Sequence, residues 1–179
     1  MLRFRSLGSG SAGNALLVEA SAPPAAEPAD VFDTAAPVTR VLVDCGLGQR
    51  QLIARLADIG LKPQALNAIF ITHEHRDHVG CAPQLAQKLG IPIWMSHGTW
   101  SAIGQPDLQG WLRLAIDGAA IALSEHCELL PFTVPHDARE PLQLVIRNGV
   151  RRMGICTDLG HPSAHVVDQL QGCHALVLE

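Results

Sequence analysis

The sequence lacks the features of a membrane or secreted protein. No apolar run approaches the roughly 18 residues that a membrane-spanning helix needs, so a transmembrane protein is not expected. The N-terminal stretch MLRFRSLGSGS contains basic residues but no apolar h-region, which argues against a secretory signal. The five cysteines are odd in number and include no C-x-x-C pair, a pattern that favours reduced thiols and a cytoplasmic location.

The sequence also lacks a net positive charge and a serine-nucleophile motif, and each absence excludes a class of function. The chain has 13 basic against 17 acidic residues, a formal net charge of -4 and a pI near 6.1. This balance excludes the strongly basic composition of proteins that hold nucleic acid by charge alone. The sequence also lacks the G-x-S-x-G motif, so a serine hydrolase of the nucleophile-elbow type has no support.

The chain does contain enough apolar residues for one domain. Of its 179 residues, 47% are hydrophobic, which suffices for a genuine core. Short apolar runs alternate with segments in helical spacing, and this interleaving predicts an α/β layered domain. Asn148-Gly149 predicts a hairpin with a type I′ turn, which needs positive φ at both central residues. The expected helices lie near 52–59, 79–89 and 163–171, and the expected strands are 4–7, 15–19, 40–44, 68–72, 91–95, 112–116, 119–123, 128–134, 142–147, 150–156 and 175–178.

Two segments depart from this alternation. Residues 21–39 carry four prolines and many alanines, which predicts a surface loop or disordered insertion inside a single domain of residues 1–179. The chain stops on Leu178-Glu179, at the edge of a predicted strand and without a polar tail. We therefore expect it to end before the second half of the domain is complete.

Residues 8–13, GSGSAG, match the G-x-G-x-x-G pattern of dinucleotide-binding proteins. That motif needs a helix directly afterwards, whose N-terminus holds the pyrophosphate. Here residues 15–19 form a predicted strand, and Pro23-Pro24 leave no room for a helix of useful length. A glycine-rich connection between two strands is the better interpretation.

The strongest chemical signal directly follows the predicted strand 68–72. His73, His75, Asp77 and His78 place four potential metal ligands within six residues. On an extended backbone the first three project to one side, and a turn could bring His78 back towards a second cation. Imidazole and carboxylate together suit Zn, Mn or Fe. Because burying such a cluster without a cation would leave many unsatisfied polar groups, it predicts a metal site.

Two later residues repeat this placement. His136 follows the predicted strand 128–134, and Asp158 follows the predicted strand 150–156. Sheets of α/β proteins collect their ligand-binding groups just beyond the ends of strands. We therefore expect both side chains to join the metal site.

Together these residues resemble the metallo-β-lactamase superfamily. The H-x-H-x-D-H motif of residues 73–78, with His136 and Asp158, carries the resemblance. Further segments make the chain similar to the bacterial single-domain branch of hydrolases and exonucleases, which is related to tRNA 3′-processing endonuclease Z and to cyclic phosphodiesterases. These segments are SGSAGN at 9–14, LVDCG at 42–46 and HDAREP at 136–141.

The resemblance implies an αββα sandwich, here lacking part of its C-terminal half, with a dinuclear site along one edge. The implied ligands are His73, His75 and His136 for the first metal, Asp77 and His78 for the second, and Asp158 as the bridge between them.

Two other residues enter through the same resemblance. Asp44 resembles an early aspartate of the family that supports the metal loop by hydrogen bonds, a role that suits a carboxylate at a strand end. The family's last ligating histidine follows the strand that matches 175–179, where this chain stops. The second metal would then lack a terminal ligand, unless His161 substitutes for it.

The expected activity is metal-dependent hydrolysis of phosphodiester bonds, as a DNA exonuclease. The expected substrate is nucleic acid or a small phosphodiester. Two divalent ions, Zn or Mn with Fe as a further option, would lower the pKa of a bound water to about 7 and give hydroxide at neutral pH. Asp77 would orient this nucleophile and take its proton, so no side-chain nucleophile is needed.

Three other interpretations stay open. The same scaffold could hydrolyse a thioester or another small-molecule ester or amide, or it could serve as an iron-dependent persulfide oxygenase. The chain could also be an inactive fragment that binds one metal at most. A sheet face left uncovered in such a fragment would favour a homodimer or aggregation.

Overall fold

The structure, a computed structural model, describes residues 1–22 and 37–178. The Pro/Ala-rich insertion expected at 21–39 lies mostly outside the described residues. No helix in the described ranges is long and apolar enough to cross a bilayer.

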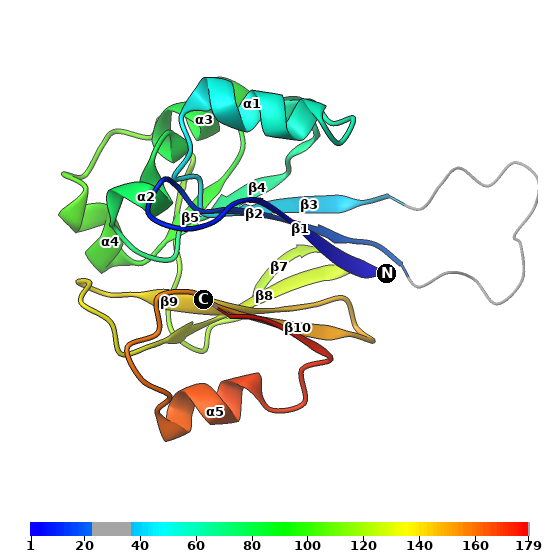
Figure 1. Cartoon of the computed structure of the whole chain (residues 1–179), viewed down its shortest axis with the longest axis vertical. Helices are drawn as coiled ribbons and strands as arrows, with labels where there is room; N and C mark the ends of the chain where they lie inside the picture. Colours follow the sequence, from blue (N-terminus) through cyan, green and yellow to red (C-terminus); the bar gives the residue numbers. More distant parts are fainter. Residues whose placement is uncertain (23–36, 179) are drawn as a thin grey trace, which may run out of the picture.

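Two β-sheets pack face to face (Figure 1). The first sheet runs in the order β1-β2-β3-β4-β5-β6, with β1 (Leu2–Gly8), β2 (Ala15–Ala20), β3 (Thr39–Val43), β4 (Ala68–Phe70), β5 (Ile93–Met95) and β6 (Leu112–Leu114). The second runs in the order β11-β10-β9-β8-β7, with β7 (Ile121–Ser124), β8 (Cys127–Thr133), β9 (Leu142–Arg147), β10 (Arg152–Cys156) and β11 (Ala175–Leu178).

Helices lie on the outer sides of both sheets. On the side of the first sheet are α1 (Gln49–Ala57), the short 3-10 helix η1 (Pro63–Ala65), α2 (Arg76–Val79), α3 (Ala82–Leu89) and α4 (His97–Ala102), and on the side of the second is α5 (Ala164–Leu170) (Figure 1). This order of layers confirms the expected αββα sandwich. Both β layers are present, and within the described residues α5 is the helix that covers the second sheet.

The alternation of side chains along β3 builds two of the apolar layers at once. Leu42 points to the helices, where it joins a cluster with Ile69 and Leu85. Its neighbours Val41 and Val43 point the other way, into a cluster between the two sheets. A strand buried on both faces in this way reads as a continuous apolar run, which is why RVLVD is recognisable in the sequence. A third, smaller cluster lies between the second sheet and α5.

Because of their directions, several strands have their carboxyl ends at the same edge of the sandwich. Strands β3, β4, β5 and β6 are mutually parallel. Strands β8 and β10 both run antiparallel to β9, so they point the same way as each other. All the predicted metal ligands lie in the segments that directly follow β4, β8 and β10.

Two local expectations differ from the structure. The helix expected at 79–89 is two helices, because Gly80 adopts φ +38° between α2 and α3 and breaks the helical path. The hairpin at Asn148-Gly149 joins β9 and β10 as expected, but of these two residues only Gly149 has positive φ. The type I′ assignment is therefore wrong, and the arrangement with Gly149-Val150 at the centre is typical of a type II′ turn.

Several large apolar side chains are exposed on the second half of the chain. Val167 on α5 and Leu176 and Leu178 on β11 are 57%, 46% and 61% exposed. Isolated exposed apolar residues are normal on protein surfaces. Homodimer formation therefore stays a prediction.

Candidate metal centre

The H-x-H-x-D-H segment leaves the sheet at β4 and folds back at once. Thr72 and His73 are completely buried, and His75 stands at the N-terminus of α2. The single turn of α2 then carries Asp77 and His78. This turn returns His78 to the interior, where it is 1% exposed. It is the turn that the sequence required for His78 to reach a shared site.

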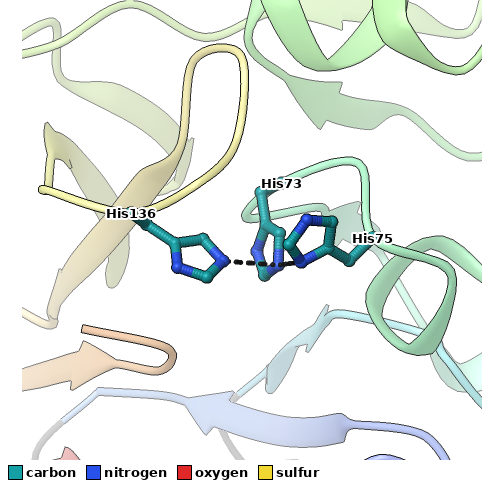
Figure 2. Close-up of side chains that lie close together, drawn as sticks. All are labelled: His73, His75 and His136. Atoms are coloured by element: carbon teal, nitrogen blue, oxygen red, sulfur yellow. Dashed lines mark hydrogen bonds between the residues drawn. The ribbon is translucent and has the colours of Figure 1, made fainter. Parts of the chain in front are cut away.

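Three imidazoles meet at the first half of the site (Figure 2). His73 Nε2 lies 3.0 Å from His75 Nδ1 and 3.3 Å from His136 Nε2. His136 comes from the loop after β8, so the trio joins the two sheets. Burial, together with the charges of His78, His136 and His75, lowers the pKa of His73 from 6.5 to about 3. The ring is therefore neutral at pH 7, which leaves a lone pair for a cation.

A second group forms around the same buried ring. His73, His78 and Asp158 bring one nitrogen or oxygen each to within 4.8 Å of the others. Asp158 Oδ2 lies 2.7 Å from His78 Nε2 and 3.8 Å from His73 Nε2. Asp158 belongs to the loop after β10, so this group also spans both sheets.

Asp77 lies beside the second group rather than in either of them. Its Oδ2 is 3.6 Å from His78 Nε2. The side chains of Asp77 and Asp158 are 33% and 36% exposed, whereas those of His73 and His78 are nearly inaccessible. The carboxylates therefore face the opening of the site, and the imidazoles form its floor.

Asp44 lies behind the imidazoles and contacts the buried segment that carries them. Its Oδ1 accepts a hydrogen bond from the Thr72 backbone N–H at 2.9 Å, and its Oδ2 lies 2.9 Å from His78 Nδ1. Burial raises the pKa of the Asp44 carboxyl, and the His78 and Thr72 hydrogen bonds oppose that shift. Burial also lowers the pKa of His78, but the hydrogen bond and charge of Asp44, together with the charges of Asp158 and Asp77, outweigh it and leave this pKa raised. The expected supporting place of Asp44 thus has a direct geometric counterpart.

The donor set fits a cation. Because a carboxylate accepts from His78 Nδ1, the neutral ring must offer a lone pair at Nε2. That lone pair faces Asp158 Oδ2, an oxygen that is buried and has no hydrogen-bond donor among the described residues. Two acceptors at 2.7 Å are stable only with a positive charge at this point, either a proton on the ring or a metal ion. Imidazole and carboxylate donors of this kind suit divalent transition metals.

Two of the aspartates at the site, Asp44 and Asp158, have an unusual backbone conformation. Asp44 has φ 59° and Asp158 has φ 54°, in the left-handed region that most side chains avoid. Aspartate tolerates this region better than most residues. Residues held in such conformations concentrate at functional sites, where the surrounding structure fixes them.

Sequence reasoning missed Asn14 as a site residue. Its backbone N–H donates to the Asp77 carbonyl at 2.7 Å, and its Nδ2 lies 3.0 Å from His78 Nε2 and 3.4 Å from Asp77 Oδ2. The SGSAGN turn between β1 and β2 is therefore packed on the ligand loop. The motif itself was a signal, but the contact partner lies more than 60 residues away in sequence.

Glu74 ties the two ligand-bearing loops together. Its Oε1 accepts a hydrogen bond from the Arg139 backbone N–H at 2.6 Å. Glu74 stands between two ligands of the motif, and Arg139 stands three residues after His136. This link keeps the loop from the second sheet in place against the first.

The remaining histidines lie elsewhere. Among the described residues His161 is exposed and joins neither ligand group, so it does not replace a terminal ligand here. His174 accepts a hydrogen bond from the Arg152 backbone N–H at 3.2 Å, at the start of β10 and far along the strand from Asp158. The other three are His97, His126 and His165, and they too belong to neither group.

Among curated proteins, the chain is similar to two that are named exodeoxyribonucleases. It is 30% identical over 183 residues to exodeoxyribonuclease YycJ of Bacillus anthracis, covering 99% of this chain and 62% of that protein. It is 26% identical over 185 residues to exodeoxyribonuclease WalJ of Streptococcus pneumoniae, covering 99% of this chain and 61% of that protein. The chain thus spans 61–62% of the length of these relatives.

Structural comparison and a family model agree on the fold. The metallo-beta-lactamase fold protein YhfI from Bacillus subtilis matches with a TM-score of 0.70 at 13% identity, covering 98% of this chain and 70% of that one. A likeness at this identity concerns the fold. The family model described as the metallo-beta-lactamase superfamily matches residues 39–178, which hold every predicted ligand. On the fold, the ligand motif and this match, the chain belongs to the metallo-beta-lactamase superfamily.

Proposed function

We propose that the protein is a metal-dependent phosphodiester hydrolase that acts on DNA as an exonuclease. The observation that carries the proposal is the convergence of histidine and aspartate side chains from both sheets on two overlapping ligand groups. Two divalent cations are proposed to bind there, with Zn or Mn as the candidate ions. Cations at such a site lower the pKa of a water molecule and neutralise charge that develops on phosphodiester oxygens.

The proposed role of each site residue follows from how deeply its side chain is buried. The buried rings of His73 and His78 and the partly buried His75 and His136 are proposed to hold the cations with neutral lone pairs. Asp158 lies 2.7 Å from His78 and 3.8 Å from His73, the ring that both ligand groups share, so it is proposed to link the two cations.

Asp77 faces solvent at the mouth of the site, 3.6 Å from His78 Nε2. It is proposed to orient the attacking water and to accept its proton, because its carboxylate is both near the ligands and reachable from outside.

The nucleic-acid substrate is supported by the relatives. YycJ and WalJ are both named exodeoxyribonucleases, and each aligns with 99% of this chain. The net charge of -4 gives no general attraction to phosphate. We therefore propose that recognition of the substrate depends on cations in the site rather than on a basic surface.

The proposal is tested with end-labelled DNA and with a generic chromogenic phosphodiester, each with added Mn or Zn and with a chelator. Both substrates should be cleaved only when metal is present. The variant His75→Ala removes one ring of the trio in Figure 2 and should lower the rate by on the order of 100-fold or more. The matched control His174→Ala, at the start of β11, should keep the wild-type rate.

Three results would contradict the proposal. Cleavage that is indifferent to chelator or to His75→Ala would remove the metal from the reaction. Hydrolysis of a thioester with no action on either phosphodiester would indicate a different hydrolase. Bound iron with oxygen uptake on a persulfide would indicate an oxygenase.

A further inference from the structure

The structure brings together two cysteines that the proposed hydrolysis does not use. Cys45 Sγ and Cys81 Sγ are 3.4 Å apart, although the residues are 36 positions apart in sequence. Cys45 immediately follows Asp44 after β3, and Cys81 lies between α2 and α3. Both are free thiols.

The backbones around the two thiols are held side by side. The Cys81 N–H donates to the Cys45 carbonyl at 3.2 Å, and the Cys45 N–H donates to the His78 carbonyl at 2.7 Å. A side chain at Gly80 would collide with the Cys45 carbonyl, so glycine is required for this close approach. A disulfide needs about 2.05 Å between sulfur atoms. The sulfurs therefore have to move together by little more than 1 Å.

The two thiols differ in access. Cys45 is fully buried, whereas Cys81 is only half buried. Cys81 also lines a surface hollow of about 460 Å³ next to Arg76 and Gln84, and Cys45 does not. A small oxidant can therefore reach the Cys81 thiol first. The buried Cys45 thiol lies next to it, within 3.4 Å.

We propose that Cys45 and Cys81 form a modification site, a dithiol that hydrogen peroxide converts into an intramolecular disulfide. In the first step the Cys81 sulfur attacks one peroxide oxygen, the O–O bond breaks, and Cys81 becomes a sulfenic acid with release of one water. In the second step the Cys45 sulfur attacks the Cys81 sulfur, the S–O bond breaks, and the Cys45 proton leaves with the oxygen as a second water. The two thiols lose two electrons and two protons, and the peroxide takes up both.

The disulfide would enclose the ligand motif. Residues 45 and 81 flank His73, His75, Asp77 and His78 in the sequence, so the bridge closes a loop that contains all four. The bridged residues also adjoin Asp44 and the end of α2. The site of modification is therefore separate from the ligands but connected to the segments that hold them.

The test is treatment of the purified, metal-containing protein with hydrogen peroxide at a concentration that fully oxidises free glutathione. The count of free thiols in the denatured product should fall from five to three, because the two bridged thiols no longer react. Tryptic digestion without reductant should recover peptide 41–50 linked to peptide 77–88, and reductant should separate them.

Variants define the direction of attack. Cys45→Ser should leave Cys81 as a sulfenic acid that dimedone traps, and Cys81→Ser should leave the buried Cys45 unreacted. The matched control Cys173→Ser removes a half-buried thiol from another cluster and should still give the linked peptides.

The proposal is overturned if peptides 41–50 and 77–88 are recovered unlinked with both thiols intact. It is also overturned if Cys81 proceeds to a sulfinic acid without linkage, or if either thiol pairs with a different cysteine. Mapping of the unmutated protein decides among these outcomes, so the result does not depend on whether a variant folds.

Discussion

At the scale of single residues, Asp44 is buried directly behind the proposed metal ligands. Its carboxylate accepts hydrogen bonds from Thr72 and from His78 Nδ1. The second contact fixes which His78 nitrogen carries the proton, and it aims the other nitrogen at Asp158. Groups of this kind typically contribute 10- to 100-fold, roughly, to metal affinity.

We therefore expect Asp44→Asn to weaken cation binding by about 10- to 100-fold, because an amide cannot hold His78 in the same tautomer with the same strength. Competition with a chelating dye measures the affinity. Asp58→Asn, on an exposed residue at the end of α1, is the matched control and should bind like the wild type. Equal affinity of the Asp44→Asn protein would show that Asp44 has no part in orienting the ligand.

Two buried thiols make a separate residue-scale prediction about alkaline stability. Burial raises the pKa of Cys127 and of Cys156 from 9.0 to about 11. Between these pH values the folded thiols keep protons that the unfolded chain releases. The unfolded state then binds fewer protons, so the free energy of unfolding falls as the pH rises through this window.

The fall should be on the order of 1.4 kcal/mol per pH unit for each thiol. The sequence has no tyrosine, so the other side chains that titrate near this range are two lysines and the three remaining cysteines. Urea unfolding at about pH 8 and pH 10.5 in reductant checks this, and Cys127→Ala should reduce the loss. Equal stability at the two pH values would refute it.

The sequence predicted some site residues and not others for a physical reason. His73, His75, Asp77 and His78 are adjacent in the chain, so their density is visible without a fold. Asn14 acts on Asp77 and His78 across a contact that forms only when the β1–β2 turn packs on α2. The pairing of Cys45 with Cys81 likewise has no local pattern, because it arises from the approach of two loops.

At the scale of elements, the loop after β3 and the helix α2 form one packed unit. Gly46 lies against the Asp77 carbonyl so closely that a Cβ atom at this position would overlap it. The Gly46 N–H also donates to the Asn14 carbonyl at 2.8 Å. Three separate segments therefore meet at a point that admits only glycine.

This packing predicts that Gly46→Ala destabilises the protein by about 1–3 kcal/mol or more, because the backbone of α2 must shift. Gly48→Ala is the matched control, since Gly48 has open space around it and an ordinary φ of -65°. Urea unfolding compares the two variants. Equal stabilities would mean that α2 moves freely, and the site would then be less rigid than the contacts indicate.

The sequence predicted long elements better than short ones. The apolar runs of β8 and β9 and the spacing of α1 span enough residues to show a period. Helices α2 and α4 have four and six residues, which is too few for a period to be visible. Their positions depend on contacts with other segments, such as the Glu140 carboxylate that accepts from the Gly98 N–H at 2.6 Å.

At the scale of the whole molecule, the ligand groups connect the two sheets. His73, His75 and His78 come from the first sheet, and His136 and Asp158 come from the second. A cation bound by both sides would act as a cross-link between the layers. Because it binds the folded state alone, it would also stabilise that state.

We expect chelation of the metal-loaded protein to lower the melting temperature by roughly 5–10 °C, which corresponds to free metal at about 100 times its dissociation constant. Metal content is measured first, and thermal unfolding is then followed with and without chelator. In Asp158→Ala the second sheet loses one contact to the cation, so the chelator effect should shrink. Identical melting of loaded and chelated protein would contradict the cross-link.

The division of ligands between the sheets also sets an order during synthesis. A chain leaving the ribosome presents the four groups of residues 73–78 well before His136 and Asp158 appear. Until the second sheet has emerged and folded, the nascent polypeptide can offer a cation only the ligands of the first sheet. A cation that needs ligands from both sheets would therefore be bound only after the segment that carries Asp158 has left the ribosome.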